Sequence, residues 1–179
     1  MLKYIFILFL NGWYLNSNTK SLFAGTAEIN FIPPKVVLTG SKGGLVAGGS
    51  FDTSTMKNSV HVIFYVDPDA KDQNEPTEIA LKAASHLKDR FVSVAIINMK
   101  ATSIPNFLLS ALIADKQKEY PNTIYVEDLE KVFVKEWGLQ DDSTQVLVMD
   151  KSGQIIFNRS GLLNEGDLSL LVKTIEGAL

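Results

Sequence analysis

The chain contains no cysteine among its 179 residues. A protein without thiols forms no disulfides, holds no metal through thiolates and performs no thiol chemistry. Histidine is almost as scarce, since His61 and His86 are the only two. Neither histidine is accompanied by a nucleophilic serine motif or by metal-ligand spacing, so we expect both to be structural. The missing thiols exclude a thiol–disulfide oxidoreductase and a cysteine-dependent peroxidase.

Basic residues are too few and too scattered to indicate nucleic-acid binding. The sequence has 17 Lys and Arg against 20 Asp and Glu, a net charge of −3. No basic block or aromatic–basic stripe is present, so nucleic acid is not an expected partner. The content of 46% hydrophobic and 21% charged residues is ordinary for a globular protein. A chain of this length can form one domain with a substantial core.

Long hydrophobic runs are also lacking. The apolar run Tyr4–Leu10 is interrupted by Asn11 and Gly12, whereas a membrane-spanning helix needs about 20 apolar residues. The run follows Lys3 and precedes small residues up to Ala27, which is the layout of a secretory signal peptide.

The N-terminal layout predicts the domain organisation and the compartment. We predict a signal peptide over residues 1–27 and one domain over residues 28–179. The protein is then exported to the periplasm, with no membrane span after cleavage. An uncleaved N-terminal membrane anchor is the alternative.

Residues 60–88 are the stretch around which the domain is organised. The apolar run Val60–Val66 predicts a strand buried on both faces. The polar segment Asp67–Pro76 predicts a loop, and apolar residues at helical spacing predict a helix over Thr77–Lys88. The loop between such a strand and helix usually carries the chemistry of an α/β domain. In a thioredoxin-like protein it would hold C-x-x-C, but here it holds four acidic residues and no cysteine.

The remaining pattern predicts an α/β fold with a central mixed sheet flanked by helices. An N-terminal β-hairpin is expected from Val36–Leu38 and Leu45–Ala47, joined by a glycine-containing turn. The final two strands are expected to be antiparallel because the turn Asp150–Gly153 joins them. The other predicted elements are strands over Phe91–Ile97, Thr123–Val126, Thr144–Met149 and Gln154–Asn158, and helices over Pro105–Tyr120, over Leu129–Trp137 and after Asn164.

The segment from Tyr120 to Leu163 resembles thioredoxin-like proteins of the peroxiredoxin and TlpA type. Those proteins share a strand ending in an acidic residue, a short helix ending at an aromatic residue and glycine, a strand running into D-x-x-G, and a glycine before the last helix. More narrowly, the chain resembles the YtfJ family of periplasmic proteins. The matching residues are Tyr120-Pro121, Trp137, Asp150-Lys151-Ser152-Gly153, Gly161-Leu162 with Glu165, and Pro33-Pro34.

This resemblance implies a thioredoxin-like fold and a periplasmic location, but no established activity and no catalytic residues. Redox-active thioredoxin-like proteins have a low-pKa thiolate at the start of the first helix and a cis-proline before a core strand. Here the thiol position falls within Asp67–Glu75, and the proline position falls near Asp142-Ser143-Thr144. Neither segment has the required residue, so we expect a redox-inactive member.

The acidic loop has two alternative interpretations. Asp67, Asp69, Asp72 and Glu75 could bind Ca²⁺ or Mg²⁺, since hard cations take clustered oxygen ligands. However, Lys71 replaces the third ligand of the D-x-[DN]-x-[DN]-G pattern and no glycine follows. The other interpretation is a solvated loop beside the positive end of the next helix.

A phosphatase is the enzymatic alternative. A strand followed by Asp67-Pro68-Asp69 is similar to the first motif of haloacid-dehalogenase phosphatases, in which the first Asp attacks phosphate and the second acts as acid and base. Thr102 or Ser103, a lysine and Asp141-Asp142 would have to take the remaining roles of that active site. Lys71 and Asp72 stand where that motif has threonine and an apolar residue, and a final β-hairpin does not suit that fold.

The sequence therefore predicts an exported, redox-inactive thioredoxin-fold module that binds a periplasmic protein or a small ligand. No catalytic residue, metal site or cofactor is expected. The alternative is a metal-dependent phosphatase or hydrolase that uses the acidic loop. The candidate binding residues are Asp67, Asp69, Asp72, Glu75, Ser143 and Thr144.

Overall fold

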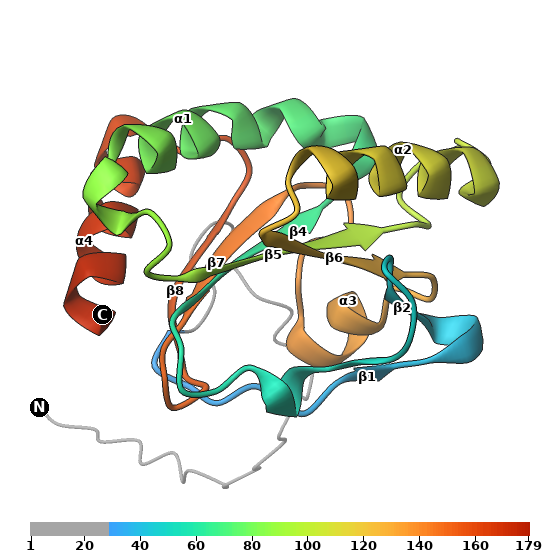
Figure 1. The fold of residues 1–179 in the computed structure, drawn as a ribbon, viewed down its shortest axis with the longest axis horizontal. Helices are drawn as coiled ribbons and strands as arrows, with labels where there is room; N and C mark the ends of the chain where they lie inside the picture. Colours follow the sequence, from blue (N-terminus) through green and yellow to red (C-terminus); the bar gives the residue numbers. More distant parts are fainter. Residues whose placement is uncertain (1–28) are drawn as a thin grey trace, which may run out of the picture.

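The computed structural model describes residues 29–179, which form a six-stranded mixed sheet with helices on both faces (Figure 1). The strand order is β2-β6-β5-β4-β7-β8. The α/β class and the mixed sheet expected from the sequence are confirmed. The strands of this sheet are β2 (Gly43–Leu45), β4 (His61–Val66), β5 (Val92–Asn98), β6 (Thr123–Asp128), β7 (Gln145–Met149) and β8 (Ile155–Ser160).

The three central strands of the sheet are parallel. β5 pairs in parallel with β4 on one side and with β6 on the other. β7 is antiparallel to β4, β8 is antiparallel to β7, and β2 is antiparallel to β6. Because β4, β5 and β6 end at the same edge, the residues at their carboxyl ends lie close together.

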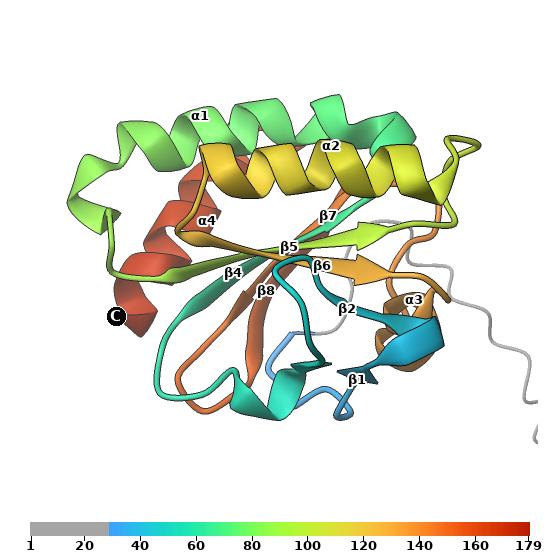
Figure 2. The ribbon, with the colours of Figure 1, turned by 45° about the vertical axis from the view of Figure 1, so that its right-hand side comes forward.

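Helices cover both faces of the sheet (Figures 1 and 2). α1 and α4 pack on β4, β7 and β8, and α2 packs on β5 and β6 on the same face. α3 packs on the opposite face, with a small N-terminal strand pair, around the fully buried Phe133. The helices are α1 (Glu75–Ala83), α2 (Asn106–Glu119), α3 (Val132–Trp137) and α4 (Glu165–Ala178), and the 3-10 segment η3 (Pro68–Asn74) precedes α1.

The N-terminal strand pair is present, but its second strand differs from the expected hairpin. β1 (Val37–Leu38) pairs antiparallel with β3 (Phe51–Asp52) as a separate two-stranded sheet. The run expected as the second arm, Leu45–Ala47, begins in β2 and joins the main sheet through β6. Gly43 makes this possible: its φ is +111°, and a Cβ there would lie 1.9 Å from the carbonyl oxygen of Glu127. Only glycine combines this backbone angle with so close an approach.

The prediction of a polar loop over Asp67–Pro76 was wrong, because this segment is helical. η3 follows β4 almost directly and continues into α1. The Asp67 side chain accepts a hydrogen bond from the Asp69 amide at 2.8 Å. Pro68 occupies the first turn, where its missing N–H removes no helical bond. The helix-starting signals therefore stand at the beginning of the segment and not at Pro76.

The other expected elements are present with shifted bounds. The helix predicted over Thr77–Lys88 ends at Ala83, and the 3-10 turn η4 (Ser85–Leu87) follows it. Gly138 ends α3 in the left-handed conformation, with φ 67°, as expected for a helix C-cap. β6 extends beyond the predicted strand to Asp128, and this extension places a carboxylate at the sheet edge.

The predicted signal peptide, residues 1–27, lies outside the described residues. Within residues 29–179, the search for a helix of the length and hydrophobicity needed to cross a bilayer found none.

Candidate functional site

Three polar side chains stand at the carboxyl ends of the three parallel strands. Tyr65 is the last residue but one of β4, Asn98 ends β5 and Asp128 ends β6. Asn98 and Asp128 are register partners, and all three side chains are fully buried. Ligands of α/β proteins bind at this edge of the sheet, so these residues are the starting point for the candidate site.

The Asp128 carboxylate caps α3 from within the protein. One oxygen accepts hydrogen bonds from the amides of Glu130 at 3.3 Å and Val132 at 2.8 Å. The other accepts the amide of Phe133 at 3.0 Å and the hydroxyl of Tyr65 at 3.3 Å. The first amides of a helix have no partner within the helix, and the helix dipole stabilises a carboxylate there. Asp128 therefore joins β4, β6 and α3, and both its oxygens are occupied by structural bonds.

The Tyr65 hydroxyl is a constant hydrogen-bond donor to the Asp128 carboxylate. Burial raises the pKa of this hydroxyl well above the usual range, and the negative charge of Asp128 raises it further. The phenol therefore stays protonated and cannot act as a general base at neutral pH. Its ring centroid lies 6.1 Å from that of Phe133, whose ring meets Trp137 edge-on at 4.8 Å. Tyr65 thus couples the polar cluster to the aromatic core beneath α3.

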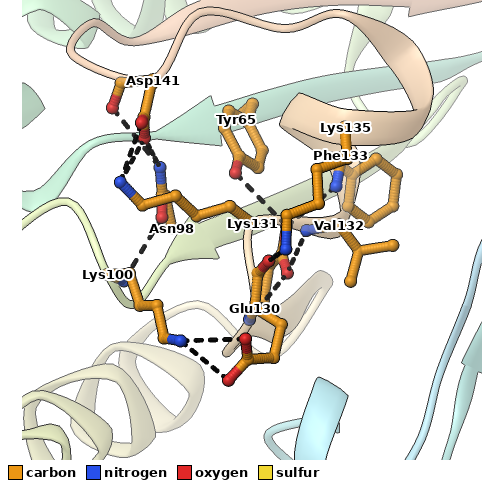
Figure 3. Close-up of polar contacts among 10 residues, drawn as sticks. Tyr65, Asn98, Lys100, Glu130, Lys131, Val132, Phe133, Lys135 and Asp141 are labelled. Atoms are coloured by element: carbon orange, nitrogen blue, oxygen red, sulfur yellow. Dashed lines mark hydrogen bonds and ion pairs between the residues drawn. The ribbon is translucent and has the colours of Figure 1, made fainter.

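A second polar group anchors the segment that leads into β7 (Figure 3). The Asn98 amide donates to the Asp141 carboxylate at 3.0 Å, and the Lys131 ammonium lies 2.7 Å from the same carboxylate. Lys131 has a left-handed backbone, with φ 53°, which costs a non-glycine residue roughly 1 kcal/mol. The ion pair between Lys100 and Glu130, at 2.8 Å, lies beside this group. The segment before β7 is therefore held at Asp141, close to the candidate residues 143 and 144.

Asp141 is expected to make the stability of the fold sensitive to acid. Its hydrogen bond to Lys131 is the main reason that its pKa lies below the ordinary value of 3.8. A carboxyl with a lowered folded-state pKa stabilises the protein above its unfolded-state pKa, and this contribution is lost as the pH falls through the folded-state value. We therefore expect Asp141→Asn to lose less stability than the wild type between about pH 5 and pH 2. Urea unfolding midpoints across this pH range measure the difference.

Asp142→Asn is the matched control for this experiment. Asp142 is exposed and makes no ion pair among residues 29–179. Its substitution should leave the pH dependence of the urea midpoint close to that of the wild type. An Asp141→Asn variant with the same pH dependence as the wild type would contradict a stabilising role for this carboxylate.

The structure brings Ser143 and Thr144 against η3. The side-chain oxygen of Gln73 accepts the Ser143 hydroxyl and the Thr144 amide, each at 3.2 Å. The Thr144 hydroxyl donates to the carbonyl oxygen of Ala70 at 3.3 Å. Thr144 is fully buried and Ser143 is partly exposed, so Thr144 holds the two segments together while Ser143 reaches the surface. No peptide bond within residues 29–179 is cis.

We call the exposed part of this junction the η3 surface: Asp69, Lys71, Asp72, Gln73 and Ser143. It lies where the resemblance to redox-active thioredoxin-like proteins places C-x-x-C opposite the cis-proline. Asp72 is its most prominent member, with a side chain that is 87% exposed and paired with Lys71 at 2.6 Å. An exposed pair of this kind contributes little to stability, so both side chains can exchange partners readily.

The four acidic residues of the predicted site do not converge. Asp67 is buried and faces the Asp69 amide, whereas the Asp69 carboxylate accepts the Thr102 hydroxyl at 2.6 Å. Asp72 and Glu75 are exposed. Among residues 29–179, no three His, Cys, Asp or Glu side chains gather as metal ligands. The Ca²⁺ or Mg²⁺ alternative therefore lacks a converged set of ligands.

The phosphatase alternative requires Asp67 as a free nucleophile. Asp67 is only 6% exposed and its carboxylate caps η3. The structure does bring Asp69, the second Asp of that motif, to the hydroxyl of Thr102. This contact joins two loops at the sheet edge, but it leaves the required nucleophile covered.

Two buried polar atoms at the junction of η3 and α1 have no hydrogen-bond partner within residues 29–179. They are Oδ1 of Asn74 and Oγ1 of Thr77, in residues that are almost fully buried. Each unpaired buried polar group costs about 1–3 kcal/mol. Unpaired buried polar atoms of this kind occur more often at functional sites than elsewhere in a fold.

Sequence reasoning did not identify Tyr65, Asn98 and Asp128 as a cluster. Each is a polar residue at or near the end of a predicted apolar strand, and consecutive parallel strands bring such residues together. That positional signal was present in the sequence. Recognising the cluster also requires the strand order, because only adjacent strands place their end residues in contact.

Comparison with known proteins identifies one family. A family model described as "Bacterial protein of unknown function (YtfJ_HI0045)" matches residues 46–177. The uncharacterised protein YtfJ of Escherichia coli is 28% identical over 113 residues, which are 62% of this chain and 60% of that protein. An uncharacterised protein of Haemophilus influenzae is 25% identical over 109 residues, which are 60% of this chain and 59% of that protein. The matched region thus spans about three fifths of each relative.

Solved structures with the same fold come from the thioredoxin superfamily. The exposed lipoprotein thioredoxin Etrx1 of Streptococcus pneumoniae has a TM-score of 0.55 at 14% identity, covering 78% of this chain and 98% of that one. A peroxiredoxin-like protein of Aquifex aeolicus has a TM-score of 0.58 at 12% identity, covering 86% and 88%. At these identities the similarity shows the fold alone, and it confirms the expected thioredoxin-like class.

Proposed function

The chain belongs to the YtfJ_HI0045 family of bacterial proteins of unknown function, and from this premise we propose that it is a redox-inactive, thioredoxin-fold binding module of the periplasm. The fold is that of thiol-active proteins, yet the sequence has no cysteine. Thiol exchange needs a thiolate, so binding is the function that this scaffold supports best. The proposed partner is a periplasmic protein or a small ligand.

One observation carries this proposal. Gln73 holds η3 to Ser143 and Thr144 at the position where redox-active relatives would place their thiols. These contacts bond the amide and hydroxyl of Thr144. The η3 surface combines a base fixed by buried Thr144 with exposed groups such as Asp72. Rigid support beneath exposed polar groups is what a binding surface requires.

Two further features support the same location. Asn74, whose Oδ1 is unpaired among residues 29–179, ends η3, and Thr77 lies in the first turn of α1. Asp141 is anchored by Asn98 and Lys131 and limits movement of the segment that ends in Ser143. The unpaired atoms lower the stability of the fold near the η3 surface, and the contacts of Asp141 restrict motion there.

Export is the second part of the proposal. The short basic start, the interrupted apolar run and the small residues up to Ala27 support a signal peptide over residues 1–27. Fractionation of cells, followed by N-terminal sequencing of the periplasmic form, tests this part. Recovery of the protein only from the cytoplasm would contradict it.

Site-specific photocrosslinking in cells tests the binding surface. A photoreactive residue is placed at Asp72, on the η3 surface, and at Lys173 as a control. Lys173 is exposed on α4, which packs near β7 and β8, at the opposite edge of the sheet from β6 and β2. We expect a discrete adduct from position 72 that is absent from position 173. The adduct should weaken at least severalfold in Gln73→Ala, because this substitution removes the acceptor for both Ser143 and Thr144.

Two results would contradict the proposal. No adduct from position 72 would leave the η3 surface without a partner. Equal adducts from positions 72 and 173 would indicate random collision rather than docking. Because periplasmic proteins can be crosslinked without lysis, the experiment uses the protein at its natural concentration.

A further inference from the structure

α2 exposes apolar side chains that the sheet does not cover. The sequence from Ala101 to Ala114 contains no charged residue, and it includes the first half of α2. Leu109 and Ile113 are buried against the sheet. On the outward side we define the α2 apolar face as Ile104, Phe107, Leu108, Ala111 and Leu112.

The exposure of this face is large for single side chains. Phe107 is 73% exposed, Leu112 is 57% exposed and Leu108 is 47% exposed. Together the face presents on the order of 400 Å², the size of the largest apolar patch on a typical monomer, which is often functional. A helix that is apolar around most of its circumference is usually covered by other protein. The α2 apolar face therefore has the composition of a contact surface.

Charged residues around this face differ in whether they form ion pairs. On α2 itself the charged residues pair with each other, Lys116 with Glu119 and Lys118 with Asp115, each at 2.8 Å. On the neighbouring η3 and α1, which lie beside α2 in Figure 2, Asp69, Glu75 and Glu78 have a different environment. None of these three carboxylates has a cationic side chain within 4.0 Å among residues 29–179.

The one unpaired cation on α1 is already engaged in another contact. The Lys82 ammonium lies 5.9 Å from the ring centroid of Tyr120, at the far end of α2 from Phe107. Asp69 lies at the near end, because its carboxylate binds the Thr102 hydroxyl just before α2. The η3 and α1 segments beside α2 therefore carry a net negative charge, because residues 67–83 contain five acidic residues and two lysines.

We propose that the α2 apolar face docks an amphipathic helix of a partner protein, with basic residues beside its apolar stripe. The apolar stripe would cover Phe107, Leu108 and Leu112 in a helix-on-helix contact. The basic residues would pair with Glu75 and Glu78. These two carboxylates lie in the first turn of α1.

A second copy of the chain fits this face less well. A twofold contact places the same patch on both sides, so it would bring the uncompensated carboxylates of the two copies together. The exposed area is also about half of the roughly 800 Å² per partner that a stable interface buries. An anionic membrane surface would be repelled by the same carboxylates. A basic amphipathic helix is the occupant that satisfies both the apolar area and the charge.

Binding of two synthetic peptides tests the proposal with the purified full chain. One probe is a helical Leu/Lys amphipathic peptide, and the other is a Leu/Glu peptide with the same apolar stripe. We expect fluorescence anisotropy to show saturable binding of the Leu/Lys peptide at least tenfold tighter than that of the Leu/Glu peptide. Phe107→Ser combined with Leu112→Ser should weaken Leu/Lys binding at least tenfold, and Glu75→Gln combined with Glu78→Gln should weaken it severalfold.

Leu162→Ser is the matched control, because Leu162 is equally exposed but lies after β8, outside the α2 apolar face. It should bind the Leu/Lys peptide like the wild type. Circular dichroism verifies that each variant is folded, which is expected because all substituted side chains are exposed. Binding that Leu162→Ser weakens as much as the Phe107/Leu112 variant would overturn the proposal, and so would undetectable binding.

Two other outcomes assign the face to a different occupant and also overturn the proposal. A concentration-dependent dimer in sedimentation, lost in the Phe107/Leu112 variant, would assign the face to a second copy. Binding to vesicles containing anionic lipid, lost in the same variant, would assign it to a membrane. The test is independent of the η3 surface, since neither peptide experiment involves position 72 or Gln73.

Discussion

Asp128→Ala is expected to lower the free energy of unfolding by about 3–5 kcal/mol, a large part of the stability of a domain of this size. The substitution leaves the amides of Val132 and Phe133 and the hydroxyl of Tyr65 buried without their acceptor. Loss of a helix cap alone costs about 1 kcal/mol, and each buried donor left unpaired adds to that cost. Urea unfolding followed by far-UV circular dichroism measures the change.

Two further variants separate the cap from the charge. Asp128→Asn keeps one oxygen acceptor but turns an amide donor toward two other donors, so we expect roughly half the loss of Asp128→Ala. Asp115→Ala is the surface control, because Asp115 is exposed on α2 and, in the described part of the chain (residues 29–179), pairs with Lys118 alone. Its unfolding midpoint should stay close to that of the wild type. If Asp128→Ala unfolds at the same urea concentration as Asp115→Ala, the inferred role of Asp128 is wrong.

Gly43→Ala is the second substitution with a large expected effect, a loss of about 3 kcal/mol. Alanine is strained at a φ of +111°, and its Cβ would lie 1.9 Å from the carbonyl oxygen of Glu127. The clash is with backbone, so β2 must move away from β6 and break the pairs between Gly43 and Asp128 and between Leu45 and Val126. Thermal unfolding of the variant measures the loss.

Gly48→Ala separates the clash from the backbone angle. Gly48 has a φ of +100°, but a Cβ there would meet no atom within 4 Å. We therefore expect only the conformational cost, about 1 kcal/mol. A Gly43→Ala variant as stable as Gly48→Ala would show that β2 can leave the sheet without consequence.

Most of the fold was predictable from local patterns in the sequence. The apolar runs that became β4 and β5 cannot be solvated, and the turn Asp150–Gly153 left only one direction for β8. The pairing of β1 with β3 was not predictable. Leu45 and Val46 are apolar enough for either a hairpin arm or a strand on β6, and only the close approach allowed by Gly43 decides between them.

The sequence named the two segments that meet at the η3 surface but not the contacts between them, and a binding site there stays a prediction. The expectation that residues 67–75 and 143–144 share a surface agrees with the bonds of Gln73, although Gln73 itself was not singled out. The spacing of four carboxylates suggested a cation site, but helix formation in η3 separates them. From the sequence alone, an aspartate that caps a helix cannot be distinguished from one that binds a cation. The backbone conformation shows that Asp67 is a helix cap.

The capping of α3 by a strand residue also determines how this part of the protein can open. α3 is only six residues long, too short to be stable by itself, and its first amides would ordinarily exchange with solvent through local fraying. Here those amides are bonded to Asp128, which is also bonded to Tyr65 of β4. α3, the ends of β4 and β6, and the anchored segment before β7 therefore form one cooperative unit. The η3 surface at Ser143 is attached to that unit, so we expect it to keep its shape until the sheet itself unfolds.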